Sequence, residues 1–154
     1  MYKKVLVPLD GSALAECTLS HVKNLFKDGF VGEVTLLNVV KLDLPWTVMG
    51  SEYPQRIDIN AIREPLFIAS RKYLADIESR LGSEGIKVKT ESLEGNRPAD
   101  TITEYAQKKG MDMIIIGTHG YTGLKKLMMG SVAFGVLHQS HIPVLLIRPE
   151  SCRT

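Results

Sequence analysis

The sequence predicts an α/β fold: an open parallel sheet of five strands, with four helices distributed over both of its faces. Short β-branched runs alternate along the chain with longer segments in which apolar residues recur at helical spacing. Glycine and proline mark the boundaries of these segments. A repeat of this kind joins parallel strands by right-handed crossovers. The length fits one domain, expected over residues 1–149, with a short C-terminal tail at residues 150–154.

The first strand is expected at residues 3–9, a short β-branched run. A helix follows it, with Ser12 as its N-cap and Gly29 as its stop. The second strand is expected at residues 33–40. The apolar face of the intervening helix is formed by Ala15, Leu19, Val22 and Phe26.

The connection over residues 41–60 contains two prolines and has no clear period. Connections of this length in compact domains are often functional or mobile, and its role stays open. Pro65 is expected to begin a long helix that ends near Gly82. The alternating run at residues 86–94 predicts an edge strand or a half-covered strand. The apolar stripe of the long helix comprises Ile62, Leu66, Tyr73, Leu74, Ile77 and Leu81.

The last part of the chain repeats the alternation. A helix with Pro98 in its first turn and Gly110 after its last turn is followed by a buried strand at residues 111–117. A glycine-rich segment then leads to a helix at about residues 131–140, and the apolar run at residues 142–148 is the final strand.

The composition excludes several classes of protein. The net charge of +2, with scattered basic residues, predicts no nucleic-acid or anionic-membrane partner. No apolar run approaches the roughly 20 residues of a membrane helix. The N-terminal run is too short for the apolar region of a signal peptide, so a cytoplasmic protein is expected. Cys17 and Cys152 are far apart in the sequence and are expected to be free thiols in a reducing compartment.

Glycines gather after the fourth predicted strand. In open parallel sheets, ligands bind beyond the carboxyl ends of the strands, where the strand order reverses. Gly117 ends a buried strand, Gly120 follows, and Gly130 precedes Ser131 at a predicted helix start. A glycine beside the exposed N–H groups of a helix start admits a phosphate without a Cβ in its way. The alternative is that the glycines only form turns and that Ser131 is only an N-cap.

Two common nucleotide motifs are missing. The sequence has no GxxxxGK[ST] motif, which excludes a Walker P-loop, and no GxGxxG after the first strand, which argues against a nicotinamide dinucleotide fold.

The spacing Gly117-x2-Gly120-x9-Gly130-Ser131 resembles the nucleotide-binding motif of the universal stress protein family. The resemblance covers essentially the whole chain and rests on five pieces in the family's order. Between Gly95 and Pro98 lie two residues where the family pattern has one. The pieces are "KKVLVPLDGS", "VTLLNVV", "GNRPADTITEYA", "DMIIIGTHG" and "GSVAFGVLHQSHIPVLLIRP".

The resemblance implies a Rossmann-like sheet of order 3-2-1-4-5 and, because every glycine of the motif is kept, membership of the ATP-binding branch. It implies that Asp10 holds the ribose hydroxyls, that the backbone of Val39 contacts adenine, and that Mg²⁺ or Mn²⁺ accompanies the phosphates. It implies a nucleotide site formed by Pro8, Asp10, Val39, Gly117, Thr118, His119, Gly120, Tyr121, Thr122, Gly123, Gly130, Ser131, Val132 and Ala133.

Three functions are open at this point. The first is a nucleotide-dependent regulatory switch in the stress response, read by a protein partner that the sequence does not identify. The second is a slow Mg²⁺-dependent ATP hydrolase, although no set of nucleophile, base and orienting residue is found. The third is a dimeric interaction module with a vestigial nucleotide site, against which the intact glycine spacing argues. No catalytic or metal-ligating residue is assigned.

The resemblance also implies a homodimer. The last strand would lie at the edge of the sheet and pair with its copy across a two-fold axis, which removes an aggregation-prone edge. Leu145→Pro is expected to delete one N–H from that edge. The interface would be formed by Val144, Leu145, Leu146 and Ile147.

Overall fold

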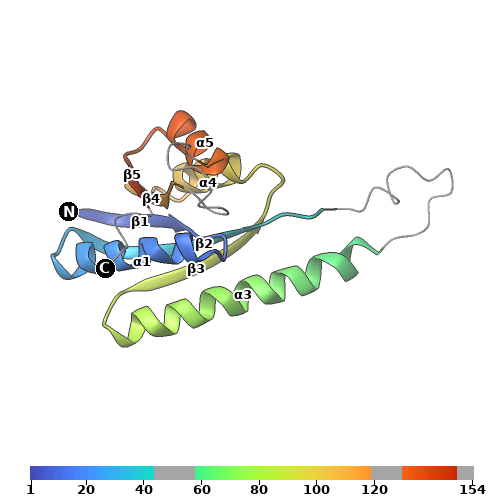
Figure 1. Cartoon of the computed structure of the whole chain (residues 1–154), viewed down its shortest axis with the longest axis horizontal. Coiled ribbons are helices and arrows are strands. Elements are labelled where there is room, and N and C mark those ends of the chain that lie inside the picture. Colours follow the sequence, from blue (N-terminus) through green and yellow to red (C-terminus); the bar gives the residue numbers. More distant parts are fainter. Residues whose placement is uncertain (44–57, 119–129, 149–154) are drawn as a thin grey trace.

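A computed structural model describes residues 1–43, 58–118 and 130–148 of the chain. Its five parallel strands have the order β3-β2-β1-β4-β5, which confirms the predicted fold class and strand order. Strands and helices alternate along the chain (Figure 1). In chain order the elements are β1 (Tyr2–Pro8), α1 (Ala13–Lys27), β2 (Val31–Val40), α3 (Ile59–Ser83), β3 (Val88–Glu94), α4 (Pro98–Lys108), β4 (Met113–Gly117), α5 (Ser131–Gln139) and β5 (Val144–Ile147).

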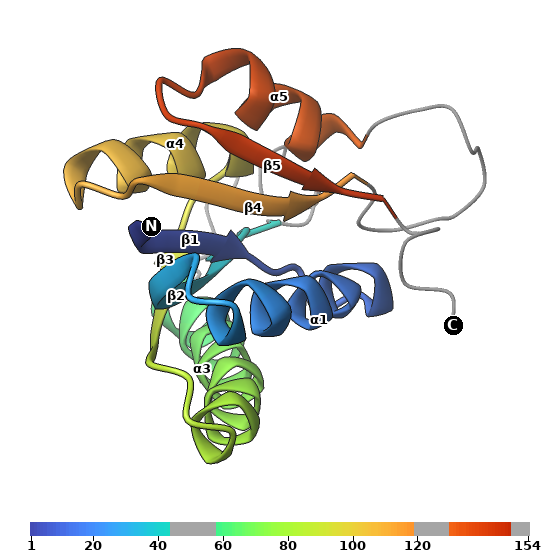
Figure 2. The same ribbon diagram turned by 90° about the vertical axis from the view of Figure 1, so that its left-hand side faces the viewer.

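The sheet separates two apolar cores. The helices α1 and α3 cover one face, and α4 and α5 cover the other (Figure 2). Side chains of a strand point alternately to opposite faces, so β1 contributes to both cores. Val5 and Val7 pack with α1 and α3, whereas Leu6 between them packs with α4 and α5. The long apolar runs of the sequence follow from this burial on both faces.

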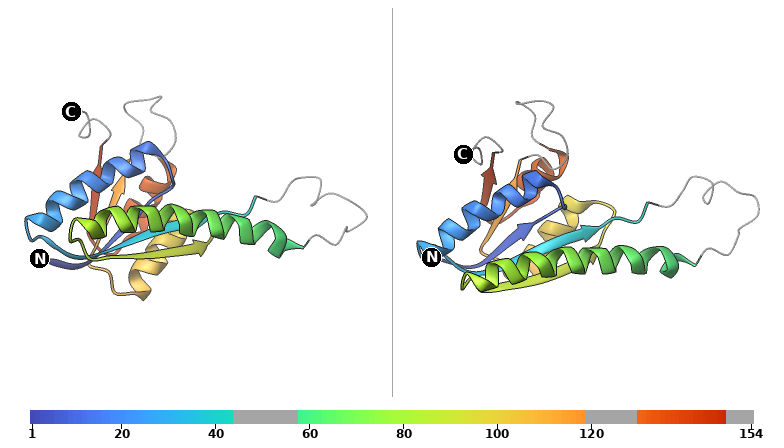
Figure 3. Two further views of the ribbon diagram at one scale, coloured as in Figure 1. Left: turned by 90° about the horizontal axis from the view of Figure 1, so that it is seen from below. Right: turned by 60° about the horizontal axis from the view of Figure 1, so that its bottom comes forward.

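Helix α3 begins six residues earlier than Pro65, so the predicted start is wrong. Asp58 is its N-cap, and its carboxylate accepts a hydrogen bond from the Asn60 N–H at 3.0 Å. Pro65 therefore lies inside the helix. The first of the four buried residues of α3 is Ser70, and Leu66 before it is 40% exposed. Only the start of α3 extends past the strands (Figures 1 and 3), and the described residues of the helix before Ser70 are exposed or half-buried.

The remaining bounds differ little from the predicted ones. Strand β2 begins at Val31 rather than at residue 33, and β3 begins at Val88 rather than at residue 86. The edges of the sheet are β3 and β5, as expected for the alternating run and for the final strand. Residues 44–57, which form most of the predicted irregular connection, and residues 149–154, which include the predicted tail, lie outside the described residues.

One expectation about the cysteines is wrong. Cys17, in α1, is disulfide-bonded, and the part of the chain that the structure describes holds no free cysteine. Cys152 lies outside that part. The inference of a reducing compartment from free thiols therefore loses its support. Across the described ranges, no helix is both long enough and apolar enough to cross a bilayer.

Candidate functional site

The carboxyl ends of all five strands lie at one edge of the sheet, because the strands are parallel. At this edge β1 ends at Pro8, and its neighbour β4 ends at Gly117. The helix that follows β1 lies on one face of the sheet, and the helix that follows β4 lies on the other. The chain thus leaves the two strands in opposite directions, which makes their junction the switch point at which open α/β sheets bind ligands.

The turn from β1 to α1 is held by its own side chains. The Ser12 N–H donates to Asp10 Oδ1 at 3.0 Å, and the Ala15 N–H donates to Ser12 Oγ at 3.0 Å, which confirms Ser12 as the N-cap. Gly11 has a φ of +84°, a left-handed conformation that favours glycine. The buried Pro8 ends the strand below this turn, and the Asp10 side chain is exposed above it. Asp10 therefore has a structural role in the turn and also faces solvent at the carboxyl edge.

The backbone of Val39 is directed toward the β1 side of β2. The Val34 N–H donates to Lys87, and the Val40 carbonyl accepts from Gly95, so the even-numbered residues of β2 bond toward β3. Consecutive residues of a strand direct their backbone groups to opposite neighbours. The N–H and carbonyl of Val39 therefore face the side on which β1 has just ended.

A short backbone contact joins the end of β4 to the start of α5. The Gly130 N–H donates to the Thr118 carbonyl at 2.5 Å, and the Thr118 N–H donates to the Ile147 carbonyl of β5 at 2.9 Å. Gly130 is the N-cap of α5, and its carbonyl accepts from the Phe134 N–H at 2.9 Å. The alternative that made Ser131 the N-cap is wrong, because Ser131 is the first helical residue and its side chain is exposed.

The first turn of α5 has donors without acceptors in the helix. The N–H groups of Ser131, Val132 and Ala133 come before Phe134, whose N–H is the first to bond within the helix, and the helix start carries partial positive charge. Ala133 is buried against the sheet and Val132 is half-buried, so the helix is anchored while Ser131 faces solvent. This end of α5 is suited to an anionic group.

The glycines at this junction have ordinary backbone angles. The described glycines with positive φ are Gly11, Gly29, Gly85 and Gly110, all of them next to helix ends. Gly117 is not among them, and Gly130 has φ −60° and ψ 150°, which any residue adopts. Backbone conformation therefore does not explain the glycine at either position.

Five of the predicted site residues, which belong to the loop after β4, lie outside the described residues; they are His119, Gly120, Tyr121, Thr122 and Gly123. The other nine lie at the carboxyl ends of β1, β2 and β4 or at the start of α5. That they bind a ligand stays a prediction.

The structure shows a row of hydrogen-bonded polar side chains that the sequence analysis did not predict. Asn38 donates from Nδ2 to the Leu9 carbonyl at 2.8 Å, and its Oδ1 accepts from Ser70 Oγ at 2.7 Å. Ser70 Oγ also lies 2.7 Å from Ser92 Oγ. Two signals in the sequence pointed to it: an asparagine inside the apolar strand "LLNVV" and a serine within the apolar stripe of the long helix.

A second side chain of α3 reaches the same turn. Burial raises the pKa of Tyr73 to about 12, and the carboxylates of Glu16 and Asp10 act in the same direction. The Gly11 backbone amide opposes this rise, because it can donate a hydrogen bond to a phenolate. In the described part of the chain the buried Tyr73 hydroxyl has no hydrogen-bond partner.

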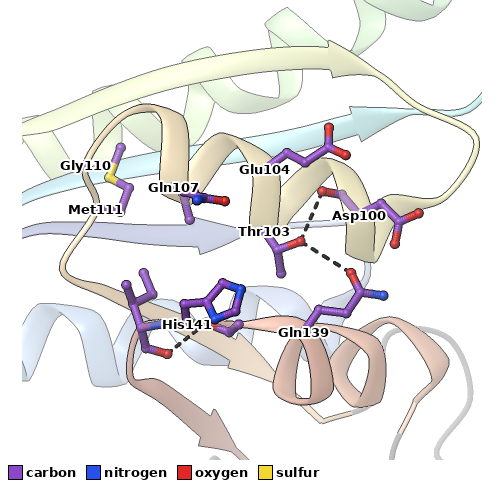
Figure 4. Close-up of a pocket in the computed structure, with 11 residues that line it drawn as sticks. Asp100, Thr103, Glu104, Gln107, Gly110, Met111, Gln139 and His141 are labelled. Carbon is purple, nitrogen blue, oxygen red and sulfur yellow. Dashed lines mark hydrogen bonds between the residues drawn. The ribbon is translucent and has the colours of Figure 1, made fainter.

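A hollow among the described residues lies elsewhere. It has a volume of about 400 Å³ and lies between α4 and the turn from α5 to β5 (Figure 4). Thr103 Oγ1, bonded to the carbonyls of Ala99 and Asp100, also lies 3.4 Å from Gln139 Oε1 at its rim. Gly110, Met111 and Ile142 place the hollow toward the amino ends of β4 and β5. It contains none of the predicted site residues.

The fold and this edge define a class: a three-layer α/β protein with a glycine-flanked helix start at the switch point of its sheet. The sequence matches the universal stress protein family over residues 1–148. The chain therefore belongs to the universal stress protein family.

Two relatives with similar sequences are universal stress proteins of one organism, Methanocaldococcus jannaschii. Universal stress protein MJ0531 of Methanocaldococcus jannaschii is 34% identical over 148 residues, which cover 96% of this chain and 83% of that protein. Universal stress protein MJ0577 of the same organism is 34% identical over 161 aligned residues, which cover 98% of each chain. A solved structure of the hypothetical protein MJ0577 is similar to this fold with a TM-score of 0.78 at 35% identity, covering 96% of both chains.

Two more distant structures were solved with nucleotides. A universal stress protein in complex with cAMP has a TM-score of 0.61 at 19% identity and covers 96% of this chain and 98% of its own. An Arabidopsis thaliana protein of the family with AMP bound has a TM-score of 0.64 at 18% identity and covers 95% and 91%. At these identities the likeness to this chain is one of fold.

Proposed function

We propose that this chain binds an adenine nucleotide, with ATP as its ligand, at the junction of β1 and β4, and that it acts as a nucleotide-dependent switch in the stress response. The expected affinity is in the micromolar range, about −8 kcal/mol. The Asp10 carboxylate takes the ribose hydroxyls, and the outward-facing backbone of Val39 takes the adenine edge. The first turn of α5 takes the phosphates.

One observation supports the proposal: position 130 is a glycine although its backbone angles do not require one. Its angles suit any residue, and its N–H is fixed to Thr118, so the position of its Cα is set. A glycine with these properties at a helix start is explained by a ligand that must approach the backbone. Phosphate is the group that this arrangement suits, since donors and partial positive charge coincide there.

Membership of the universal stress protein family supports the choice of ligand. The AMP and cAMP complexes support it in a limited sense, because proteins of this fold hold adenine nucleotides. The choice of ATP rests on the glycine spacing of this chain, which resembles that of the ATP-binding branch of the family.

A divalent ion fits this site only through the nucleotide. Within the described residues no group of three or more histidine, cysteine, aspartate or glutamate side chains is placed to hold a metal. Mg²⁺ needs few protein ligands when phosphates and water complete its shell, and Mn²⁺ takes similar oxygen ligands. We expect the ion to neutralise phosphate charge, with Asp10 occupied by the ribose.

A dimer through β5 is the second part of the proposal. β5 pairs with β4 along one side, its other side is an edge of the sheet, and Leu145 is 37% exposed. The carbonyls of Pro143 and Ile147 bond to β4, so the backbone groups of Leu145 point inward and those of Val144 and Leu146 point to the edge. The expectation that Leu145→Pro deletes an edge N–H is therefore wrong, and Leu146 is the position that tests the edge.

The test begins with nucleotide extracted from the purified protein and identified by chromatography. Titration calorimetry of the nucleotide-free protein with ATP, in the presence and absence of Mg²⁺, then measures affinity. Failure to bind ATP at millimolar concentration would refute the proposal. Release of phosphate measured under the same conditions separates a switch, which retains ATP over hours, from a slow hydrolase, which converts it to ADP.

A further inference from the structure

We propose that Asn38 is a positioning residue for the nucleotide site: oriented by Ser70 and Ser92, its carboxamide holds the Leu9 carbonyl and so sets the turn that carries Asp10. The inference rests on the proposed function for its consequence, since Asp10 matters to a ligand only if one binds. The positioning itself is a property of the protein without nucleotide and can be measured there.

The hydrogens available on each group determine the direction of every hydrogen bond in this set of polar groups. The Leu9 carbonyl is an acceptor only, so the amide nitrogen of Asn38 must face it and the amide oxygen must face Ser70. The single proton of Ser70 goes to Asn38, so Ser92 must donate to Ser70. Asn38 therefore has one allowed orientation of its amide, and a half-buried side chain held on both sides is a rigid support.

The position of Asn38 explains why an asparagine is used in this strand. Val34 and Leu36 of β2 face α3 in the core, and Asn38 continues the same column toward the carboxyl edge. In register it lies opposite Ser92 of β3. The apolar column thus becomes polar at the level of the β1–α1 turn, where the Leu9 carbonyl requires a donor.

The same bond lies at the carboxyl end of the ladder between β1 and β2. The Leu9 N–H donates to the Leu37 carbonyl at 2.8 Å. The next rung of a parallel ladder would run from the Val39 N–H to the Leu9 carbonyl, an oxygen that also accepts from Asn38 Nδ2. Asn38 thereby holds Leu9 at the end of this ladder, beside the Val39 N–H that the proposed function assigns to the adenine edge.

Helix α3 contributes to this support through Ser70, which bonds Asn38. Ser70 is the polar member of the buried row of α3 and is 6% exposed. Tyr73, on the same helix, packs against the core cluster that contains Leu9. Figure 3 shows α3 running along β2 and β3. The position of α3 is therefore transmitted to the Asp10 turn through side chains.

The test uses amide hydrogen exchange, followed by nuclear magnetic resonance, on the full chain without nucleotide. Asn38→Leu keeps the size of the side chain and removes the donor to Leu9, and Ser70→Ala removes the group that orients Asn38. We expect the Leu9 amide to exchange about tenfold faster in Asn38→Leu and about threefold faster in Ser70→Ala. The Val34 amide, bonded to Lys87 in the middle of the sheet, should not change. Ser83→Ala is the control, because the Ser83 hydroxyl bonds Arg80 within its own helix.

An unchanged Leu9 amide in Asn38→Leu would overturn the inference, and so would an equal rise at Val34, which indicates general destabilisation. ATP and 2′-deoxy-ATP titrations then test the consequence. Asn38→Leu should weaken ATP about tenfold and 2′-deoxy-ATP less, because the ribose contact of Asp10 is displaced. A wild-type protein that binds no ATP would refute the proposed function, while the exchange of Leu9 would still decide the role of Asn38.

Discussion

The backbone N–H of Gly130 lies 2.5 Å from the carbonyl oxygen of Thr118, so the start of α5 is tied directly to the residue that follows β4. The bond fixes the first turn of the helix relative to the carboxyl edge of the sheet. Any ligand that uses the helix start must therefore approach at one fixed place, beside the Cα of Gly130.

Gly130→Val should abolish ATP binding and leave the fold intact. The backbone angles of Gly130 suit valine, so the helix start is not strained, but the branched side chain fills the space that a phosphate needs. Titration calorimetry should show at least a hundredfold loss of affinity, a change of about 3 kcal/mol. Gly82→Val is the matched control, since a Cβ at Gly82 meets no atom within 4 Å. Equal ATP affinity in wild type and Gly130→Val would remove the phosphate role of α5.

Asp10→Ala should weaken ATP binding tenfold or more and reduce discrimination against 2′-deoxy-ATP. Charge-assisted hydrogen bonds of this type contribute about 1.5–3 kcal/mol each. Asp10 also accepts from the Ser12 N–H, so alanine removes a turn contact as well.

Asp10→Asn separates the two roles of Asp10. Its amide oxygen can still accept from Ser12, but the negative charge toward the ribose is lost. We expect Asp10→Asn to keep the thermal stability of the wild type and to lose part of its preference for ATP over 2′-deoxy-ATP. If both variants keep the full preference, Asp10 is a turn residue only.

Leu146→Pro should convert the proposed dimer into a folded monomer. The backbone of Leu146 points to the free edge of β5, where proline deletes a donor without breaking the ladder to β4. Sedimentation at tens of micromolar should show the wild type and Leu146→Ala as dimers, because alanine keeps the N–H. Leu145→Pro should instead lower the free energy of unfolding by more than about 1 kcal/mol, since its N–H faces β4. A Leu146→Pro protein that stays dimeric would move the interface elsewhere.

Tyr73→Phe should make the protein less sensitive to alkaline pH. In the folded state the pKa of Tyr73 is about 12, above the 10.0 of a free tyrosine, so ionisation favours the unfolded chain. This contribution to stability is complete below pH 10 and is lost as the pH rises toward 12. Urea unfolding should give nearly equal stabilities at pH 8, because the deleted hydroxyl has no partner in the described residues.

At about pH 11 the phenylalanine variant should be the more stable protein by roughly 1 kcal/mol, a figure reduced for partial solvent screening. Tyr2→Phe, at an exposed position, is the control and should follow the wild type. A difference between wild type and Tyr73→Phe that stays constant from pH 8 to pH 11 would contradict the buried position of this hydroxyl.

The sequence by itself determined the order and type of the elements. A strand buried on two faces, such as β1, needs an apolar run. A helix buried on one face needs apolar residues at helical spacing, as at Ala15, Leu19 and Val22. Both patterns can be recognised in a short stretch of sequence. The cap at Ser12 and the left-handed Gly11 are likewise decided by neighbours in the chain. The glycine spacing that ends at Gly130 led to the junction of β1 and β4, and to the family.

The tertiary structure alone decided how distant residues meet. Asn38 and Ser70 are 32 residues apart, and Asn38 and Leu9 are 29 apart, so no local pattern relates them until the sheet and α3 are packed. The start of α3 after Asp58 and the direction of the Leu145 N–H toward β4 were likewise not predicted from the local sequence. Helix ends depend on competition between caps, and the direction of an edge N–H depends on the register with the neighbouring strand. Periodicity encodes which face is buried, but the partner across that face is chosen only when the layers come together.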